Sequence, residues 1–160
     1  MVDFSRLSTS WMEWMSRLGM QDIQVSTDCD DCHALFSSRD YSVHLRGEDG
    51  WWVVDIVNDR RQRTIADAKL STFELAEKYL IWKWVTQARS ILASGPLGAE
   101  LYKQGYAPGI DVSELDGAHI QICLHGDCAI LMSGTATIFS HIMLKSVDQI
   151  EQIARQGLTS

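Results

Sequence analysis

The sequence predicts an α+β fold in a single domain spanning residues 1–160. Helical hydrophobic patterns occur at the start, the middle and the end of the chain, and groups of β-type runs lie between them. This segregated order favours an antiparallel sheet over a doubly wound parallel one. The composition is 46% hydrophobic and 22% charged, close to globular averages, and no Pro-rich, Gly/Ser-rich or repetitive segment indicates a linker.

The first predicted element is an amphipathic helix. Its large apolar residues fall three or four positions apart, at Phe4, Leu7, Trp11, Trp14, Met15 and Leu18. Asp3 precedes the pattern as a candidate N-cap, and Gly19 ends it. Because they lie on the apolar stripe, Trp11 and Trp14 are expected to be buried.

A meander of antiparallel strands is expected between Ile23 and Leu70. The β-type runs are IQV, HALFSS, YSVHL and WWVVDIV, and turn signals such as Arg46–Gly50 and Asn58-Asp59 separate them. The cationic segment Arg60-Arg61-Gln62-Arg63 follows the last run. Since the net charge of −7 and the pI near 5.1 oppose nucleic-acid binding, this segment is interpreted as the solvated end of a hairpin.

A long central helix begins after these strands. Ser71-Thr72-Phe73-Glu74 has the spacing of a capping box, with Ser71 as the cap and Glu74 as its reciprocal partner. Apolar residues follow at steps of three or four, at Phe73, Ala76, Leu80, Trp84, Ala88 and Ile91. Gly95 and Pro96 are stop signals. Phe73, Leu80 and Trp84 are expected to be buried on the core side of this helix.

The second half of the chain is predicted to return to strands. A short helix from Leu97 to Lys103 leads into the loop 104–109, and strands follow at HIQICL, CAILM and TATIFSHIML. The last helix opens with a box-like start at Ser146-Val147-Asp148-Gln149 and is expected to end at Gly157.

The four cysteines form two closely spaced pairs. Cys29, Cys32 and His33 spell C-x-x-C-H, a haem-attachment pattern, but the N-terminal segment has no continuous apolar region of an export signal. The chain is therefore expected to be cytosolic and haem-free, with reduced thiols and an ordinary acidic loop. A zinc site and a disulfide or redox role remain alternatives.

The second pair flanks the hairpin CLHGDC. A His125-Gly126 turn would place Cys123 and Cys128 directly opposite each other, whereas a Gly126-Asp127 turn would offset them. The spacing alone leaves both turns open.

No pattern of catalytic residues stands out, so the chain is predicted to be neither an enzyme nor a cofactor or metal protein. The common phosphate-binding, metalloprotease and nucleophile-elbow motifs are absent, as is any stretch of about 18 apolar residues that could span a membrane. The five histidines are interpreted as structural or surface residues: His33, His44, His119, His125 and His141. Glu74 and Glu77 are assigned to capping and to a solvated helix face.

Charged residues are unevenly distributed in the second half of the chain. From Gln104 to Leu144 there are four acids and no Lys or Arg. Such a surface either aids solubility or steers a basic partner, and the adjacent loop supplies Tyr106 as a rigid amphipathic anchor. The candidate partner-binding residues are Gly105, Tyr106, Ala107, Pro108, Gly109, Asp111, Glu114 and Asp116.

Three parts of the chain carry a resemblance to a known family: the segments WWVVDIVNDRRQR and LSTFELAEKYLIWKWVTQARS, and the acidic β-rich half that follows them. They resemble a family of actinobacterial immunity proteins. This is the family that includes the antitoxin of tuberculosis necrotizing toxin. The resemblance implies a cytosolic α+β protein that binds a cognate NAD-glycohydrolase toxin domain, in a 1:1 complex, and blocks its NAD site.

Two other classes of function remain open from the residues. One is a small-molecule-binding domain or enzyme whose pocket lies under the sheet and uses His119 or His141. The other is a metal or thiol-redox protein that uses Cys29, Cys32, Cys123 and Cys128.

Overall fold

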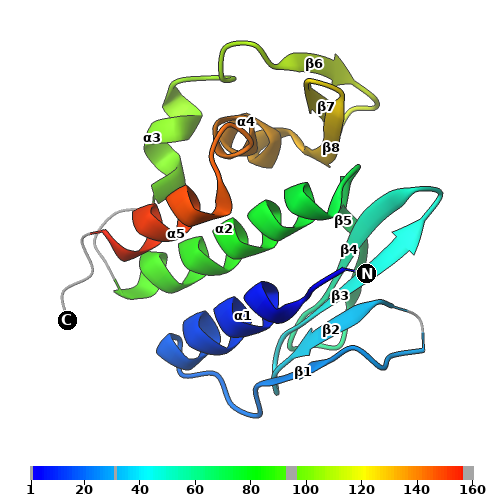
Figure 1. Cartoon of the computed structure of the whole chain (residues 1–160), viewed down its shortest axis with the longest axis vertical. Helices are drawn as coiled ribbons and strands as arrows, with labels where there is room; N and C mark the ends of the chain where they lie inside the picture. The colour runs from blue at the N-terminus through cyan, green and yellow to red at the C-terminus, as the bar shows by residue number, and fades with distance from the viewer. Residues whose placement is uncertain (1, 31, 93–96, 157–160) are drawn as a thin grey trace.

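The computed structural model describes residues 2–30, 32–92 and 97–156. The helices are α1 (Ser5–Arg17), α2 (Phe73–Leu92), α3 (Leu97–Lys103), α4 (Ser133–Ile142) and α5 (Val147–Arg155) (Figure 1). The strands are β1 (Gln24–Ser26), β2 (Ala34–Ser37), β3 (Ser42–Glu48), β4 (Trp51–Val57), β5 (Arg63–Leu70), β6 (Asp111–Glu114), β7 (His119–Leu124) and β8 (Asp127–Met132). The predicted α+β class is confirmed.

The strands form one antiparallel sheet in the order β1-β2-β3-β4-β5-β8-β7-β6. Its two halves meet at a narrow seam, because the described register between β5 and β8 is short and consists of Lys69 with Ile130 and Leu70 with Ala129. In Figure 1, α1 lies beside α2 next to the first five strands, whereas α4 packs against β7 and β8, and α3 lies on the other side of α4. Since α2 also contacts α5, this central helix connects the two halves of the domain.

The N-terminal helix matches its predicted span closely. Leu7, Trp11, Trp14 and Met15 form its buried stripe. Gly19 follows the helix with a φ of +76°, a left-handed conformation that favours glycine after a helix C-terminus. The N-cap prediction is wrong: Phe4 occupies that position without a side-chain cap. Asp3 Oδ1 instead accepts a hydrogen bond from the Ser5 amide at 2.9 Å.

The capping box predicted for α2 is also wrong. The Ser71 hydroxyl accepts a hydrogen bond from the Cys128 amide at 2.7 Å, and the Ser71 amide donates to the Cys128 carbonyl at 2.8 Å. Ser71 therefore extends the β5–β8 ladder. Thr72 takes the cap role, because its Oγ1 accepts from the Leu75 amide at 3.1 Å, and Glu74 pairs with Lys78. The stop predicted at Gly95 and Pro96 lies outside the described residues.

Aromatic side chains fill the core between α1, α2 and the sheet. The ring of Trp84 lies 5.1 Å from those of both Trp11 and Phe36, in edge-to-face contact. The burial predicted for Trp11, Trp14, Leu80 and Trp84 is confirmed. Phe73 is only partly buried, because it packs at the rim of the core against Phe4 and Trp52.

The strand predicted at TATIFSHIML is wrong, because α4 occupies most of this segment. Ala136, Phe139, Ser140 and Met143 recur at helical spacing and are buried, and α4 packs against β7 and β8. A short apolar run has no decisive period, and here the need to cover the apolar face of β7 and β8 selects the helix. β5 and β6 were not predicted as strands.

The last helix begins as predicted. The Ser146 hydroxyl accepts from the Gln149 amide at 3.1 Å, while the Gln149 side-chain oxygen accepts from the Ser146 amide at 2.8 Å. This reciprocal pair is a complete capping box. The helix is described to Arg155, and the predicted end at Gly157 lies outside the described residues.

A buried carboxylate joins three strands on the side of the sheet that carries Arg46. Asp55 lies at the bulge between β4 and β5, and its Oδ2 accepts from Arg46 Nε at 2.8 Å and Arg63 Nη2 at 2.9 Å. Its Oδ1 accepts from the Ala66 amide at 2.8 Å. Burial raises the pKa of Asp55, but the hydrogen bonds from Arg46, Ala66 and Arg63 outweigh it and hold the pKa below its usual value. Arg63 thus serves the fold at the end of the predicted cationic turn.

The Asp55 carboxylate should give the protein a measurable acid sensitivity. A depressed pKa in the folded state stabilises the protein above the unfolded-state pKa, about 4, and this contribution disappears as the pH falls through the folded-state pKa. Denaturant unfolding between pH 6 and pH 2 should therefore show a steeper loss of stability for the parent than for Asp55→Asn. Asp59→Asn, in an exposed turn, should keep the parent's profile. Equal slopes for the parent and Asp55→Asn would contradict this assignment.

Candidate functional site

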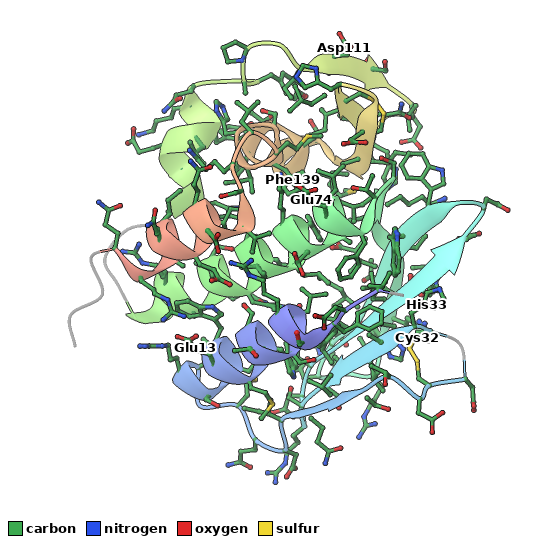
Figure 2. All side chains as sticks on the ribbon, viewed as in Figure 1. Glu13, Cys32, His33, Glu74, Asp111 and Phe139 are labelled. Atoms are coloured by element: carbon green, nitrogen blue, oxygen red, sulfur yellow. A yellow bond between two sulfur atoms is a disulfide. The ribbon has the colours of Figure 1, made fainter. Side chains whose placement is uncertain are left out.

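The predicted partner-binding residues lie on the loop between α3 and β6, on β6 itself and on the turn that follows it. In Figure 1 this segment crosses over α4, and Figure 2 shows Asp111 at the same extremity of the molecule. Tyr106 is 38% exposed, and Pro108, Gly109, Asp111, Glu114 and Asp116 are exposed as well. Ala107 is buried, so it supports the loop from beneath.

Two hydrogen bonds attach this loop to α4. The Ala107 amide donates to Ser140 Oγ at 2.9 Å. His141 Nε2 lies 2.6 Å from the Gly105 carbonyl oxygen, which can only accept, so Nε2 carries the proton and donates. Both bonds flank Tyr106 in the sequence. The backbone on each side of this side chain is therefore held in place while the ring remains accessible.

Glycine is required at the two ends of the loop by backbone conformation. Gly105 has a φ of +76° and Gly109 a φ of +83°, in the left-handed region. Apart from the glycine and its two chain neighbours, no heavy atom lies within 4 Å of a Cβ built on either residue, so the restriction is conformational and not steric crowding. A β-branched residue at Gly105 would strain the backbone beside Tyr106.

The three acids differ in their surroundings. Asp111 and Glu114 are the first and last residues of β6, and their side chains are exposed. The Asp116 carboxylate instead accepts from the amides of Ala118 and His119, both at 2.9 Å. These backbone hydrogen bonds, with a further one from the His119 ring, lower the pKa of Asp116. Asp116 therefore shapes the β6–β7 turn in addition to carrying charge.

Apolar side chains are exposed among these acids. Four of them are between 38% and 50% exposed: Tyr106 on the loop, Val112 on β6, Leu115 directly after β6 and Met132 at the end of β8. Exposed apolar residues surrounded by charge are typical of protein interaction surfaces. We call residues 105–109 together with 111–116 the loop–β6 surface.

A cleft of about 560 Å³ lies between α2, α3 and α4. Its lining residues are Tyr79, Trp82, Lys83, Thr86, Gly98, Ala99, Tyr102, Lys103, Thr135 and Ile138. This cleft is not the small-molecule pocket under the sheet, using His119 or His141, that the sequence left as an alternative. This cleft lies among helices, and neither His119 nor His141 belongs to its described lining.

Both cysteine pairs are disulfide-bonded, so the expectation of reduced thiols is wrong for this structure. Cys123 and Cys128 are direct cross-strand partners, with Cα atoms 4.1 Å apart. The turn between them is His125-Gly126, and both residues have positive φ, at 52° and 87°. The sequence left two turns open, and the structure has the one that aligns the cysteines.

The four cysteines do not converge on one metal. Cys29 and Cys32 precede β2, whereas Cys123 and Cys128 lie on β7 and β8, with β3, β4 and β5 between them in the sheet. At about 4.8 Å between neighbouring strands, β2 and β8 alone are roughly 19 Å apart across the sheet, and β7 lies one strand further. Within the described residues, no group of three or more His, Cys, Asp or Glu side chains is placed to bind a metal ion.

None of the described helices is long and apolar enough to cross a membrane.

Comparisons with known proteins assign the chain to a family. Among solved structures, Rv3902c from M. tuberculosis matches 99% of this chain and 97% of its own, with a TM-score of 0.74 and 17% sequence identity. This similarity shows a shared fold. No curated protein sequence matches significantly. The model of the family Immunity protein 61 matches residues 14–155. The chain belongs to the immunity protein 61 family.

The loop–β6 surface lies inside the region that matches the immunity protein 61 family. The resemblance to immunity proteins seen in the sequence is confirmed at the level of the family. Sequence reasoning selected the loop and its acids but did not recognise β6 as a strand. The available signal was the alternation of Asp111, Val112, Ser113 and Glu114, which is short and mostly polar.

Proposed function

We propose that this immunity protein is a cytoplasmic antitoxin that binds a cognate NAD-glycohydrolase toxin domain in a 1:1 complex and occludes its NAD-binding site. The observation that carries the proposal is the α3–β6 loop, in which two hydrogen bonds to α4 hold the backbone around the exposed ring of Tyr106. A preorganised aromatic anchor can enter a cleft with little loss of conformational entropy.

The charge of the loop–β6 surface suits such a target. A site that binds NAD must hold an anionic pyrophosphate, which proteins achieve with cationic side chains and helix N-termini. Asp111 and Glu114 are exposed beside the loop, and no Lys or Arg occurs from Gln104 to Leu144. The surface therefore complements a basic rim, and Tyr106 would occupy the space between the charges.

The direct test is to measure whether this protein inhibits NAD hydrolysis by the cognate toxin domain. Equimolar parent protein should abolish turnover, and the mixture should elute as a 1:1 complex in size-exclusion chromatography. An excess of NAD present before mixing should slow the onset of inhibition, because substrate and antitoxin compete for the same cleft. Full hydrolysis in the presence of equimolar parent protein would refute the antitoxin function.

Neutralising the two freely exposed acids should slow complex formation. We expect Asp111→Asn/Glu114→Gln to lower the association rate constant by roughly 3- to 10-fold at low salt, because rim charges steer encounter more than they hold a complex. The difference should shrink above about 0.5 M salt, where the Debye length is only a few ångströms. Stopped-flow or surface-plasmon measurements would give both rate constants.

The control for this pair is Asp49→Asn/Asp59→Asn, which removes the same charge from exposed turns between other strands. It should leave the association rate nearly unchanged. If both double variants slow association equally, net charge and not the loop–β6 surface steers the partner. Asp116 is left intact because its carboxylate also shapes the β6–β7 turn.

A further inference from the structure

β6 is an edge strand of the sheet. It pairs with β7 on one side, and no described strand pairs with its other side. All four of its residues are exposed. An open edge presents unpaired backbone donors and acceptors, which can pair with an added strand.

The hydrogen-bond pattern shows which groups face the open side. The Leu115 amide donates to the His119 carbonyl at 3.1 Å, which makes these two residues a hydrogen-bonded pair. In an antiparallel ladder, hydrogen-bonded and non-hydrogen-bonded pairs alternate. Ser113 and Asp111 therefore bond to β7, opposite Gln121 and Cys123.

The hydrogen bonds between β7 and β8 give the same assignment. The Ser133 amide donates to the Ala118 carbonyl, so Ile120 and Ile122 direct their backbone groups towards β8 and away from β6. It follows that the N–H and C=O groups of Val112 and Glu114 point away from β7. These four backbone groups form the open edge.

The side chains along this edge select a type of partner. Val112 is 41% exposed, and Asp111 and Glu114 are charged. A second copy of this chain would add two more acids to the edge and no cation. The opposite edge, β1, carries Gln24, Val25 and Ser26 and has no charge. β6 is therefore the edge that fits a cationic strand.

We propose that the toxin domain adds an extended, basic strand to β6, hydrogen-bonded to the backbone of Val112 and Glu114. This inference rests on the proposed function and specifies its binding mode. The added strand would carry an apolar residue opposite Val112 and a Lys or Arg opposite Glu114 or Asp111, since directly opposed side chains lie about 5 Å apart. The strand would lie next to the loop that carries Tyr106.

The test compares Val112→Pro with Val112→Ala in binding to the cognate toxin domain. Proline removes the Val112 N–H, which faces solvent in the free protein, so the fold should survive. We expect Val112→Pro to raise the Kd at least 10-fold, while Val112→Ala, which keeps the N–H, should change it less than 3-fold. Ser113→Pro is the internal control, because losing an N–H that bonds to β7 should lower the melting temperature of the free protein.

Hydrogen–deuterium exchange of the parent protein supplies an independent measurement that needs no folded variant. The amides of Val112 and Glu114 should exchange rapidly in the free protein and become protected in the complex. Strand addition is wrong if the parent inhibits the toxin but these amides stay unprotected, or if Val112→Pro binds like Val112→Ala. Protection that grows with protein concentration without toxin would indicate a second copy and also overturn the proposal. Failure of the parent to inhibit refutes the antitoxin function instead.

Discussion

Replacing Tyr106 with alanine is expected to raise the Kd of the toxin complex by roughly 30- to 1,000-fold. This corresponds to about 2–4 kcal/mol, the range for a central aromatic anchor that becomes desolvated on binding. The loop around Tyr106 is held by the Ala107–Ser140 and His141–Gly105 hydrogen bonds, which do not involve its side chain. The substitution should therefore leave the free protein folded and act on the complex, mainly by increasing the dissociation rate constant.

Two further variants distinguish the contribution of the Tyr106 ring from those of another exposed tyrosine and of the loop backbone. Tyr102→Ala removes a tyrosine that is 56% exposed on α3, outside the loop–β6 surface, and should leave inhibition unchanged. Gly105→Val keeps Tyr106 but strains the left-handed backbone next to it, so it should weaken inhibition. Titration of NAD hydrolysis against each variant measures these effects. Undiminished inhibition by both folded Tyr106→Ala and Gly105→Val would exclude this loop from the interface.

Trp84→Ala is expected to lower the free energy of unfolding by roughly 3–5 kcal/mol. Trp84 is fully buried on α2 and makes edge-to-face contacts with Trp11 and Phe36. Removing the indole leaves a cavity between α1, α2 and β2 that the surrounding rings cannot fill without leaving their rotamers. For a domain of this length, the loss corresponds to roughly 9–15 °C in melting temperature.

The matched comparison is a smaller ring at the same position. Trp84→Phe should retain most of the packing and melt between the parent and Trp84→Ala. Met12→Ala, on the exposed face of α1, should stay within about 0.5 kcal/mol of the parent. Circular dichroism melts and denaturant titrations give these values. A Trp84→Ala protein that melts within a degree or two of the parent would contradict the described core.

Several features of the fold could be predicted because they depend on neighbouring residues alone. The stripe of α1, the end of that helix at Gly19 and the capping box at Ser146 each involve groups within about one helical turn of each other. The strands β7 and β8 could also be predicted, because they form a hairpin of neighbouring residues. The spacing permitted two turns for this hairpin, and the structure has the His125-Gly126 turn, in which Cys123 pairs with Cys128.

The residue types of the candidate site could be predicted from the sequence, but the attachment of its loop to α4 could not. Tyr106, the glycines around it and the uninterrupted acidic balance are visible in the order of residues. The attachment of the loop to α4 was not, because Ser140 and His141 lie more than 30 positions further along the chain. Both residues were predicted to belong to a strand, and only as part of a helix do they reach the loop.

The α+β class, the three principal helices and the chemical character of the loop–β6 surface could be predicted from the order of residues, because hydrophobic period, turn residues and charge are local properties. Three features are visible only in the folded chain: the bonding of Ser71 to Cys128, the helical conformation of most of TATIFSHIML, and the position of Asp111–Glu114 at the edge of the sheet. Each of these depends on a partner far away in the chain. Local preferences are nearly balanced in a short apolar run, and also at the start of α2, where either Ser71 or Thr72 could be the N-cap. In both cases, burial against the distant partner or pairing with it supplies the larger free energy.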